Sequence, residues 1–123
     1  MAKILIVEDY PSLQRMYSMA LGNAGYDIVI ASDGKEAEKM AIEEKPNLIL
    51  LDLLMPNVNG LEFLHSFRKM QHADTKIIVF SNMDTPALKQ QVLELGISHY
   101  LIKSDFTPSE LLVIIEKTLK EKA

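Results

Sequence analysis

Five short runs of aliphatic residues are spaced along the chain, and a longer amphipathic segment separates each run from the next. Within a run the apolar residues follow one another directly, without alternation of polar and apolar positions. A strand of this composition is covered on both faces, which is typical of the parallel sheets of α/β proteins. The chain therefore predicts five buried parallel strands, at residues 3–7, 27–31, 47–51, 76–80 and 99–102.

The segments between these runs have the periodicity of amphipathic helices. In residues 13–24 the apolar side chains recur at intervals of three and four, so they share one helical face. Pro11 and Pro108 suit the first turn of a helix. Gly25 and Gly96 suit the position just past a helix end. We expect helices from Pro11 to near Gly25, over 34–44, over 60–70, through Leu88 to Gly96, and from Pro108 onward.

The length of the chain agrees with this pattern, because 123 residues make one domain. Five strand–helix units of this kind form an α/β fold with a doubly wound, five-stranded parallel sheet, written (βα)5. We expect residues 1–123 to be a single domain of this type.

Composition excludes several classes of function. The chain has 13 basic and 17 acidic residues, a formal charge of −4, so it has no electrostatic reason to bind nucleic acid or an anionic membrane. It has no cysteine, which excludes disulfides and thiolate metal sites. We see no signal peptide and no apolar stretch of membrane-spanning length, so we expect a cytoplasmic protein.

Polar side chains directly follow four of the expected strands at their carboxyl ends. Glu8 and Asp9 follow the first strand, Asp52 the third, Ser81 the fourth and Lys103 the fifth. Ligands of doubly wound sheets bind beyond these ends, so we expect one site there. Like charges ~4 Å apart repel by about 4 kcal/mol at an effective dielectric constant near 20. Mg²⁺, which prefers oxygen ligands, and the ammonium group of Lys103 would offset that repulsion.

Asp52 is the candidate nucleophile, because it ends the expected central strand. A carboxylate beside Mg²⁺, a lysine and a hydroxyl group can attack phosphorus and form an aspartyl phosphate. With these residues in order, the chain resembles the receiver domain of two-component response regulators, which has a flavodoxin-like fold. The resemblance covers nearly the whole chain, and its motifs are residues 4–9, 33–37, 51–56 with Gly60, Ser81, and 100–103.

The resemblance implies a phosphoacceptor function. A sensor histidine kinase or a histidine phosphotransfer protein would transfer a phosphoryl group to Asp52, with Lys103 beside it. Asp9, Asp52 and the main-chain carbonyl of Leu54 would coordinate Mg²⁺, and Glu8 would act mostly through water. The domain would then be no enzyme beyond catalysing its own phosphorylation and dephosphorylation.

The resemblance also implies a switch. Ser81 and the aromatic residue Tyr100 would repack the surface formed by the fourth helix, fifth strand and fifth helix, and so control a downstream protein or a fused output domain. Two positions near Asp52 affect how long a phosphoryl group survives, because polar side chains there can orient the hydrolytic water. Here these positions are Leu54 and Met83, both apolar, so we expect a long-lived phosphoryl group.

The chain departs from the family pattern at three places. Ser104 follows Lys103 where a proline in a cis peptide is usual, so the sequence leaves open whether this peptide is cis or trans. Asn82 follows Ser81 where a smaller residue is common, which narrows access for a phosphodonor. Residues 97–100 lack acidic residues and the last helix lacks arginine, so we do not expect the dimer of one DNA-binding subfamily.

Other functions remain open for the same fold. A flavodoxin-like cofactor binder would need phosphate-binding amides and hydroxyls in the first loop, but residues 8–11 begin with two acids. A phosphatase of the haloacid dehalogenase class would need an acid two residues after Asp52, where Leu54 stands. A receiver-like interaction module that is never phosphorylated is the remaining alternative.

Overall fold

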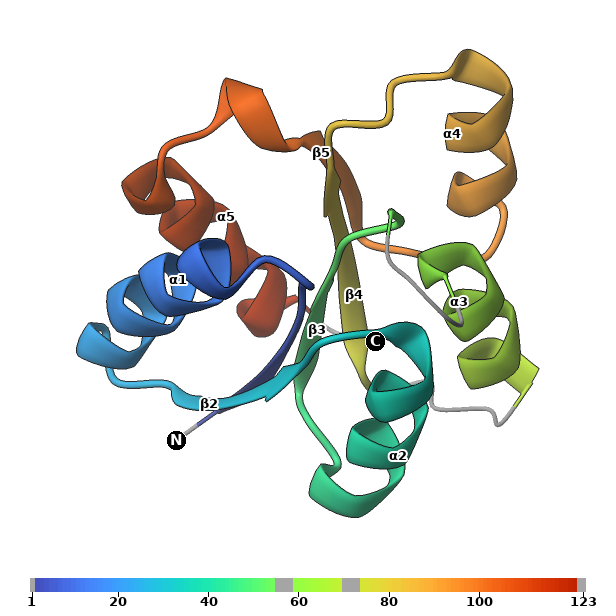
Figure 1. Ribbon diagram of the computed structural model, residues 1–123. Helices are drawn as coiled ribbons and strands as arrows, with labels where there is room; N and C mark the ends of the chain where they lie inside the picture. The colour runs from blue at the N-terminus through green and yellow to red at the C-terminus, as the bar shows by residue number, and fades with distance from the viewer. Residues whose placement is uncertain (1, 55–58, 70–73, 122–123) are drawn as a thin grey trace.

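The protein folds around one parallel sheet whose strand order is β2-β1-β3-β4-β5 (Figure 1). The structure, a computed structural model, describes residues 2–54, 59–69 and 74–121. All four neighbouring pairs of strands are parallel, and β1, β3 and β4 occupy the interior of the sheet. The strands are β1 (Lys3–Val7), β2 (Asp27–Ala31), β3 (Leu48–Leu51), β4 (Lys76–Ser81) and β5 (His99–Ile102).

Helices cover both faces of the sheet, as the expected doubly wound fold requires. Two helices lie on one face and three on the other (Figure 1). The first face carries α1 (Pro11–Asn23) and α5 (Pro108–Lys120), and the second carries α2 (Gly34–Glu44), α3 (Gly60–Lys69) and α4 (Pro86–Leu93). A single 3-10 turn, η1 (Lys103–Asp105), follows β5. Among the described helices, none has the length and apolar composition that crossing a bilayer requires.

Alternate residues of each interior strand enter different cores. Leu5 and Val7 of β1 pack in the core beneath α2, α3 and α4. Ile4 and Ile6 of the same strand pack in the core beneath α1 and α5. Both sets are almost fully buried, which explains why the sequence runs are apolar without alternation.

Local signals fix the start of two helices. Asp33 precedes α2, and its carboxylate accepts a hydrogen bond from the Glu36 N–H at 2.8 Å. Thr107 precedes α5 and forms a reciprocal capping box with Glu110, with hydrogen bonds of 3.2 and 2.9 Å. These side chains satisfy N–H groups that have no partner inside the helix.

The end of α4 differs from the sequence expectation. The expected helix reaches Gly96, whereas α4 ends at Leu93. The N–H groups of Leu95 and Gly96 donate to carbonyls three residues earlier rather than four, so the last turn is tighter than an α-helix. Gly96 then takes a left-handed conformation with φ of 79°, which still marks the exit from the helical segment.

Gly60 allows α3 to begin directly against the end of β3. Its N–H donates to the Leu53 carbonyl at 3.1 Å. A Cβ atom at this position would overlap the Asp52 carbonyl oxygen and would lie 2.6 Å from the Leu53 Cα. Both neighbours are backbone atoms next to the phosphoacceptor candidate, so they cannot move aside without moving Asp52.

We predict that Gly60→Ala lowers the free energy of unfolding by about 2 kcal/mol, because the added methyl group overpacks a rigid contact. The matched control is Gly22→Ala in α1, where an added Cβ meets no atom within 4 Å. That substitution should raise the free energy of unfolding by roughly 0.5–1 kcal/mol. Urea unfolding of both variants checks this, and equal effects would contradict the packing argument.

Candidate functional site

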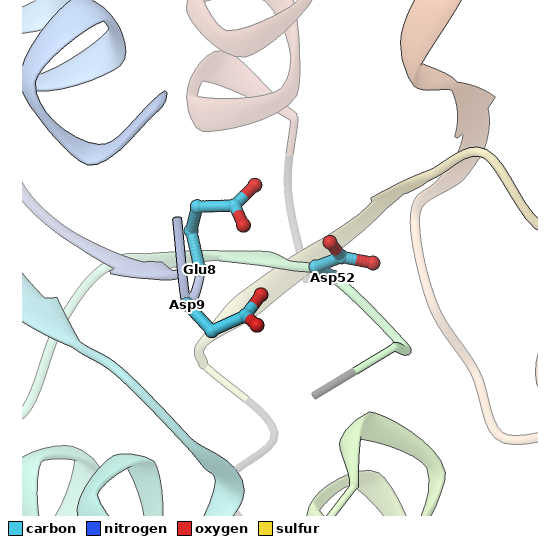
Figure 2. Close-up of side chains that lie close together, drawn as sticks. All are labelled: Glu8, Asp9 and Asp52. Carbon is cyan, nitrogen blue, oxygen red and sulfur yellow. The ribbon is translucent and has the colours of Figure 1, made fainter. Parts of the chain in front are cut away.

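The carboxyl ends of β1 and β3 bring three acidic residues together. Val7 and Leu51 are the last paired residues of these strands, so Glu8, Asp9 and Asp52 emerge side by side. The ladder continues one step, because the Asp52 N–H donates to the Val7 carbonyl at 3.1 Å. Figure 2 shows the side chains of Glu8 and Asp9 extending from the end of β1 toward the side of Asp52.

The three carboxylates are close enough to share one cation. One oxygen of each lies within 4.8 Å of the others. Glu8 and Asp52 are only 3% and 7% exposed. Asp9 Oδ1 is buried and has no hydrogen-bond partner among the residues that the structure describes, so this oxygen lacks the stabilisation that a buried anion needs. An oxygen-only set with one unsatisfied buried ligand atom fits a hard cation such as Mg²⁺.

Lys103 lies between two of these acids. Its Nζ atom is 2.5 Å from Glu8 Oε1 and 2.8 Å from Asp52 Oδ2. All three side chains are at most 10% exposed, so the ion pairs are largely shielded from solvent. Lys103 is the first residue of η1, which follows β5. Because β4 lies between β3 and β5 in the sheet, the Lys103 side chain reaches Asp52 across the end of β4.

The electrostatics of the cluster appear in two pKa shifts. Burial lowers the pKa of Lys103, but its hydrogen bonds to Asp52 and Glu8 and the negative charges of these carboxylates together outweigh burial and raise the pKa above its ordinary value. Burial raises the pKa of Glu8, and the hydrogen bonds from Lys103 and the Tyr10 N–H offset only part of this rise. Lys103 therefore stays charged, while Glu8 binds a proton more readily than an exposed glutamate.

Asp52 is held in one orientation. Its Oδ2 accepts from Lys103, and its Oδ1 accepts from the Leu54 N–H at 3.1 Å. The amide of Leu54 thus contributes to the site. Its carbonyl as a metal ligand stays a prediction. Met55 and Pro56, the last two residues of the sequence motif 51–56, lie outside the described residues.

Ser81 and Tyr100 contact the same short loop after β4. β4 ends at Ser81, one residue later than the sequence predicts. The Ser81 side chain is fully buried, and its Oγ accepts from the Met83 N–H at 3.3 Å. The Tyr100 hydroxyl donates to the Met83 carbonyl at 2.7 Å. The Lys89 Nζ lies 5.6 Å from the centre of the Tyr100 ring. In this structure the Tyr100 side chain is therefore tied to the loop that follows Ser81.

Gln14 contributes to the site although the sequence reading did not single it out. Its side-chain amide donates to the Glu8 carbonyl at 2.5 Å and to the Ser32 hydroxyl at 3.1 Å. The contact joins the loop after β1 to the loop after β2. Gln14 stands in the first turn of α1 and not at a strand end, so the strand-end rule gives no signal for it.

The peptide bond between Lys103 and Ser104 is trans. Ser104 keeps its backbone N–H, which the usual proline would lack. The loop after β5 therefore has a hydrogen-bond donor directly beside Lys103.

The sequence and the fold agree on one family. Residues 4–116 match the family described as response regulator receiver domain. The chain belongs to this family. The acidic cluster of Glu8, Asp9 and Asp52 fits the Mg²⁺ site expected of a receiver domain.

Curated relatives of this receiver domain are response regulators. ArlR of Staphylococcus saprophyticus is 38% identical over 122 residues, which cover 99% of this chain and 54% of ArlR. The alkaline phosphatase synthesis transcriptional regulatory protein PhoP of Bacillus subtilis is 36% identical over 118 residues, which cover 96% of this chain and 48% of PhoP. The chain thus spans about half the length of the curated relatives it matches.

Solved structures confirm the expected receiver fold. Chemotaxis protein CheY4 of Vibrio cholerae superposes with a TM-score of 0.86 at 34% identity, covering 96% of this chain and 98% of CheY4. The BeF3-activated receiver domain of Klebsiella pneumoniae RstA gives a TM-score of 0.83 at 29% identity, covering 97% of this chain and 99% of that domain.

We predict that Lys103→Met lowers the free energy of unfolding in metal-free buffer by about 3 kcal/mol, because two buried carboxylates lose their counter-charge. The matched control is Lys3→Met, which removes a solvent-accessible pair with Glu44 at 2.9 Å and should change stability by less than about 1 kcal/mol.

The pH dependence of the Lys103→Met effect has a definite sign. The loss should shrink as the pH falls from 7 toward 4, because protonation of Glu8, whose pKa is already raised, removes one of the unpaired charges. Urea unfolding across this pH range checks it, and a loss that grows on acidification would contradict the assignment.

Proposed function

We propose that this receiver domain accepts a phosphoryl group on Asp52 from a sensor histidine kinase or a histidine phosphotransfer protein. The observation that carries the proposal is the state of the Asp52 carboxylate, which is nearly buried yet fixed by Lys103 on one oxygen and by the Leu54 N–H on the other. Such a carboxylate is oriented for attack and lies beside a cation that can bind phosphate.

In the proposed transfer, a carboxylate oxygen of Asp52 attacks the phosphorus atom of a phosphohistidine. The P–O bond forms as the P–N bond breaks, and the electron pair of the broken bond remains on the imidazole nitrogen. Lys103 then lies next to the new phosphoryl group and balances part of its charge. Glu8, which shares the ammonium group with Asp52, keeps Lys103 charged in the low-polarity setting.

Mg²⁺ is the proposed cofactor, held by Asp9, Asp52 and the Leu54 carbonyl, with Glu8 contributing mostly through water. When bound, it supplies the positive charge that lets an anionic donor approach the acidic cluster. The unsatisfied Asp9 Oδ1 atom supports this assignment, because a buried carboxylate oxygen without a partner is costly.

The proposed output is a change in the surface formed by α4, β5 and α5. A phosphoryl group on Asp52 would attract the Ser81 hydroxyl, which would then leave the Met83 N–H. The Tyr100 hydroxyl is bound to the Met83 carbonyl, so movement of that loop reaches Tyr100 directly.

Amide chemical shifts with and without Mg²⁺ and beryllofluoride should change in residues 81–105, and changes confined to the acidic cluster would contradict the switch.

The partner of the switched surface is either a separate protein or a fused output domain, in the cytoplasm. ArlR and PhoP, which are about twice as long as their matched regions, support an output outside residues 1–123. We propose no direct nucleic-acid contact for this domain, since its net charge is −4.

We predict that a small-molecule phosphodonor with Mg²⁺ adds one phosphoryl group, roughly 80 Da, to the wild type, and that Asp52→Asn abolishes this species because the nucleophile is lost. Asp9→Asn should weaken the dependence on Mg²⁺. The control is Asp27→Asn, which removes an exposed carboxylate at the opposite end of the sheet and should leave the yield unchanged. Intact-mass spectra check this, and phosphorylation of Asp52→Asn would overturn the proposal.

The surroundings of Asp52 support a long-lived phosphoryl group. Leu54 and Met83 line an open cavity of about 260 Å³ together with other mainly apolar side chains. The remaining lining residues are Leu53, Asn59, Leu61 and Leu88. Neither Leu54 nor Met83 has a side-chain group that can orient a hydrolytic water.

We predict that the double variant Leu54→Asn/Met83→Glu loses the phosphoryl group at least about tenfold faster, which is a part of the 10²–10⁴-fold that proton-transferring groups supply. Leu93→Asn, an exposed change on α4 away from this cavity, serves as the control and should decay as the wild type does. Single-turnover decay of the phosphorylated proteins measures this. Equal lifetimes would show that these two positions do not control hydrolysis.

A further inference from the structure

A side-chain hydrogen bond joins the two loops that carry Ser81 and Lys103. The Ser104 N–H donates to the Asn82 side-chain oxygen at 2.9 Å. Asn82 directly follows Ser81, and Ser104 directly follows Lys103. Two of the residues at which the chain departs from the usual family pattern are therefore partners of each other. The contact requires a backbone N–H at position 104, which a proline would not have.

This hydrogen bond extends the pairing of β4 and β5. The backbone ladder of these strands ends at the pair Ser81–Ile102. Beyond this pair, the side-chain oxygen of Asn82, the residue after Ser81, takes the place of a backbone acceptor and binds the Ser104 N–H. Position 103 lies between these two fixed points, so the backbone of Lys103 is held on both sides.

Lys103 needs such support because its backbone is in a weak element. The turn η1 has three residues, and short 3-10 turns have poor hydrogen-bond geometry and little stability of their own. A lysine side chain has four flexible carbons, so small movements of its backbone displace the ammonium group. The ammonium group must nevertheless stay within hydrogen-bond distance of both Glu8 and Asp52.

We propose that Asn82 is a positioning residue that acts through Ser104 and holds Lys103 between Glu8 and Asp52. The role of Lys103 toward a phosphoryl group rests on the proposed function, whereas the contact between Asn82 and Ser104 does not. The sequence also predicts that Asn82 narrows the approach to Asp52, and such a steric effect would not depend on the residue at position 104. The two effects are therefore separable by experiment.

The first experiment measures the ligand-free, metal-free protein by NMR. Asn82→Ala should speed exchange of the Ser104 amide hydrogen about fivefold, the effect of losing one ordinary hydrogen bond, and should broaden the Lys103 ammonium signal. Asn82→Asp keeps an acceptor oxygen and Ser104→Ala keeps the N–H, so both should retain the protection. Unchanged exchange and an unchanged ammonium signal in Asn82→Ala would overturn the proposal.

The second experiment measures equilibrium binding of beryllofluoride with Mg²⁺. Asn82→Ala should weaken binding about 3- to 10-fold in the wild-type background, as expected for one lost hydrogen bond. The same substitution should not weaken binding in a Ser104→Pro background, where the donor is already absent. An equal loss of affinity in both backgrounds would show that Asn82 does not act through Ser104 and would overturn positioning. Unchanged or tighter binding in the wild-type background would also contradict positioning, and equally tighter binding in both backgrounds would assign Asn82 a steric role. If the wild type binds no beryllofluoride, the proposed function fails, and the exchange measurement still decides the contact.

Discussion

The ion pairs of Lys103 with Glu8 and Asp52 are the interaction on which the site depends. Two almost buried carboxylates and a half-buried third share one edge of the sheet, and a close like-charge pair costs about 4 kcal/mol even at moderate polarity. One ammonium group satisfies one oxygen of Glu8 and one of Asp52 at the same time. Among the described residues, Asp9 Oδ1 has no hydrogen-bond partner, so the charges of the cluster are balanced only in part, which supports the proposed cation site.

The fold was readable from the sequence because its signals are local. Each interior strand is covered on both faces, so its apolar run stands out against the helical periodicity on either side. The end of α4 differs, because the sequence predicts Gly96 just past the helix end whereas α4 ends at Leu93 and a tighter turn lies between the two. The tighter turn arises because its N–H groups donate to carbonyls three residues earlier instead of four. The spacing of apolar residues in the sequence does not distinguish these two hydrogen-bond patterns.

The sequence predicts which side chains lie together at the edge of the sheet, but not the contacts that they make. Glu8, Asp52 and Lys103 follow strands directly, and a parallel sheet brings such residues to one edge. The double contact of Lys103 spans 95 residues to Glu8 and 51 to Asp52, and no local pattern encodes it. Gln14 and the bond between Asn82 and Ser104 were missed for the same reason, because each partner alone is an ordinary polar residue of a loop or helix.

The strands that carry the charged residues of this site differ in how deeply they are buried. Glu8 and Asp52 follow β1 and β3, which lie inside the sheet, and every residue of β3 is buried. Lys103 follows β5, an edge strand whose residues are all only half-buried. The two carboxylates are thus attached to interior strands of the sheet, whereas the ammonium group that balances them is attached to an edge strand. A ligand that binds along β5 can therefore move Lys103 and change the charge balance at Asp52 without contacting the acidic cluster.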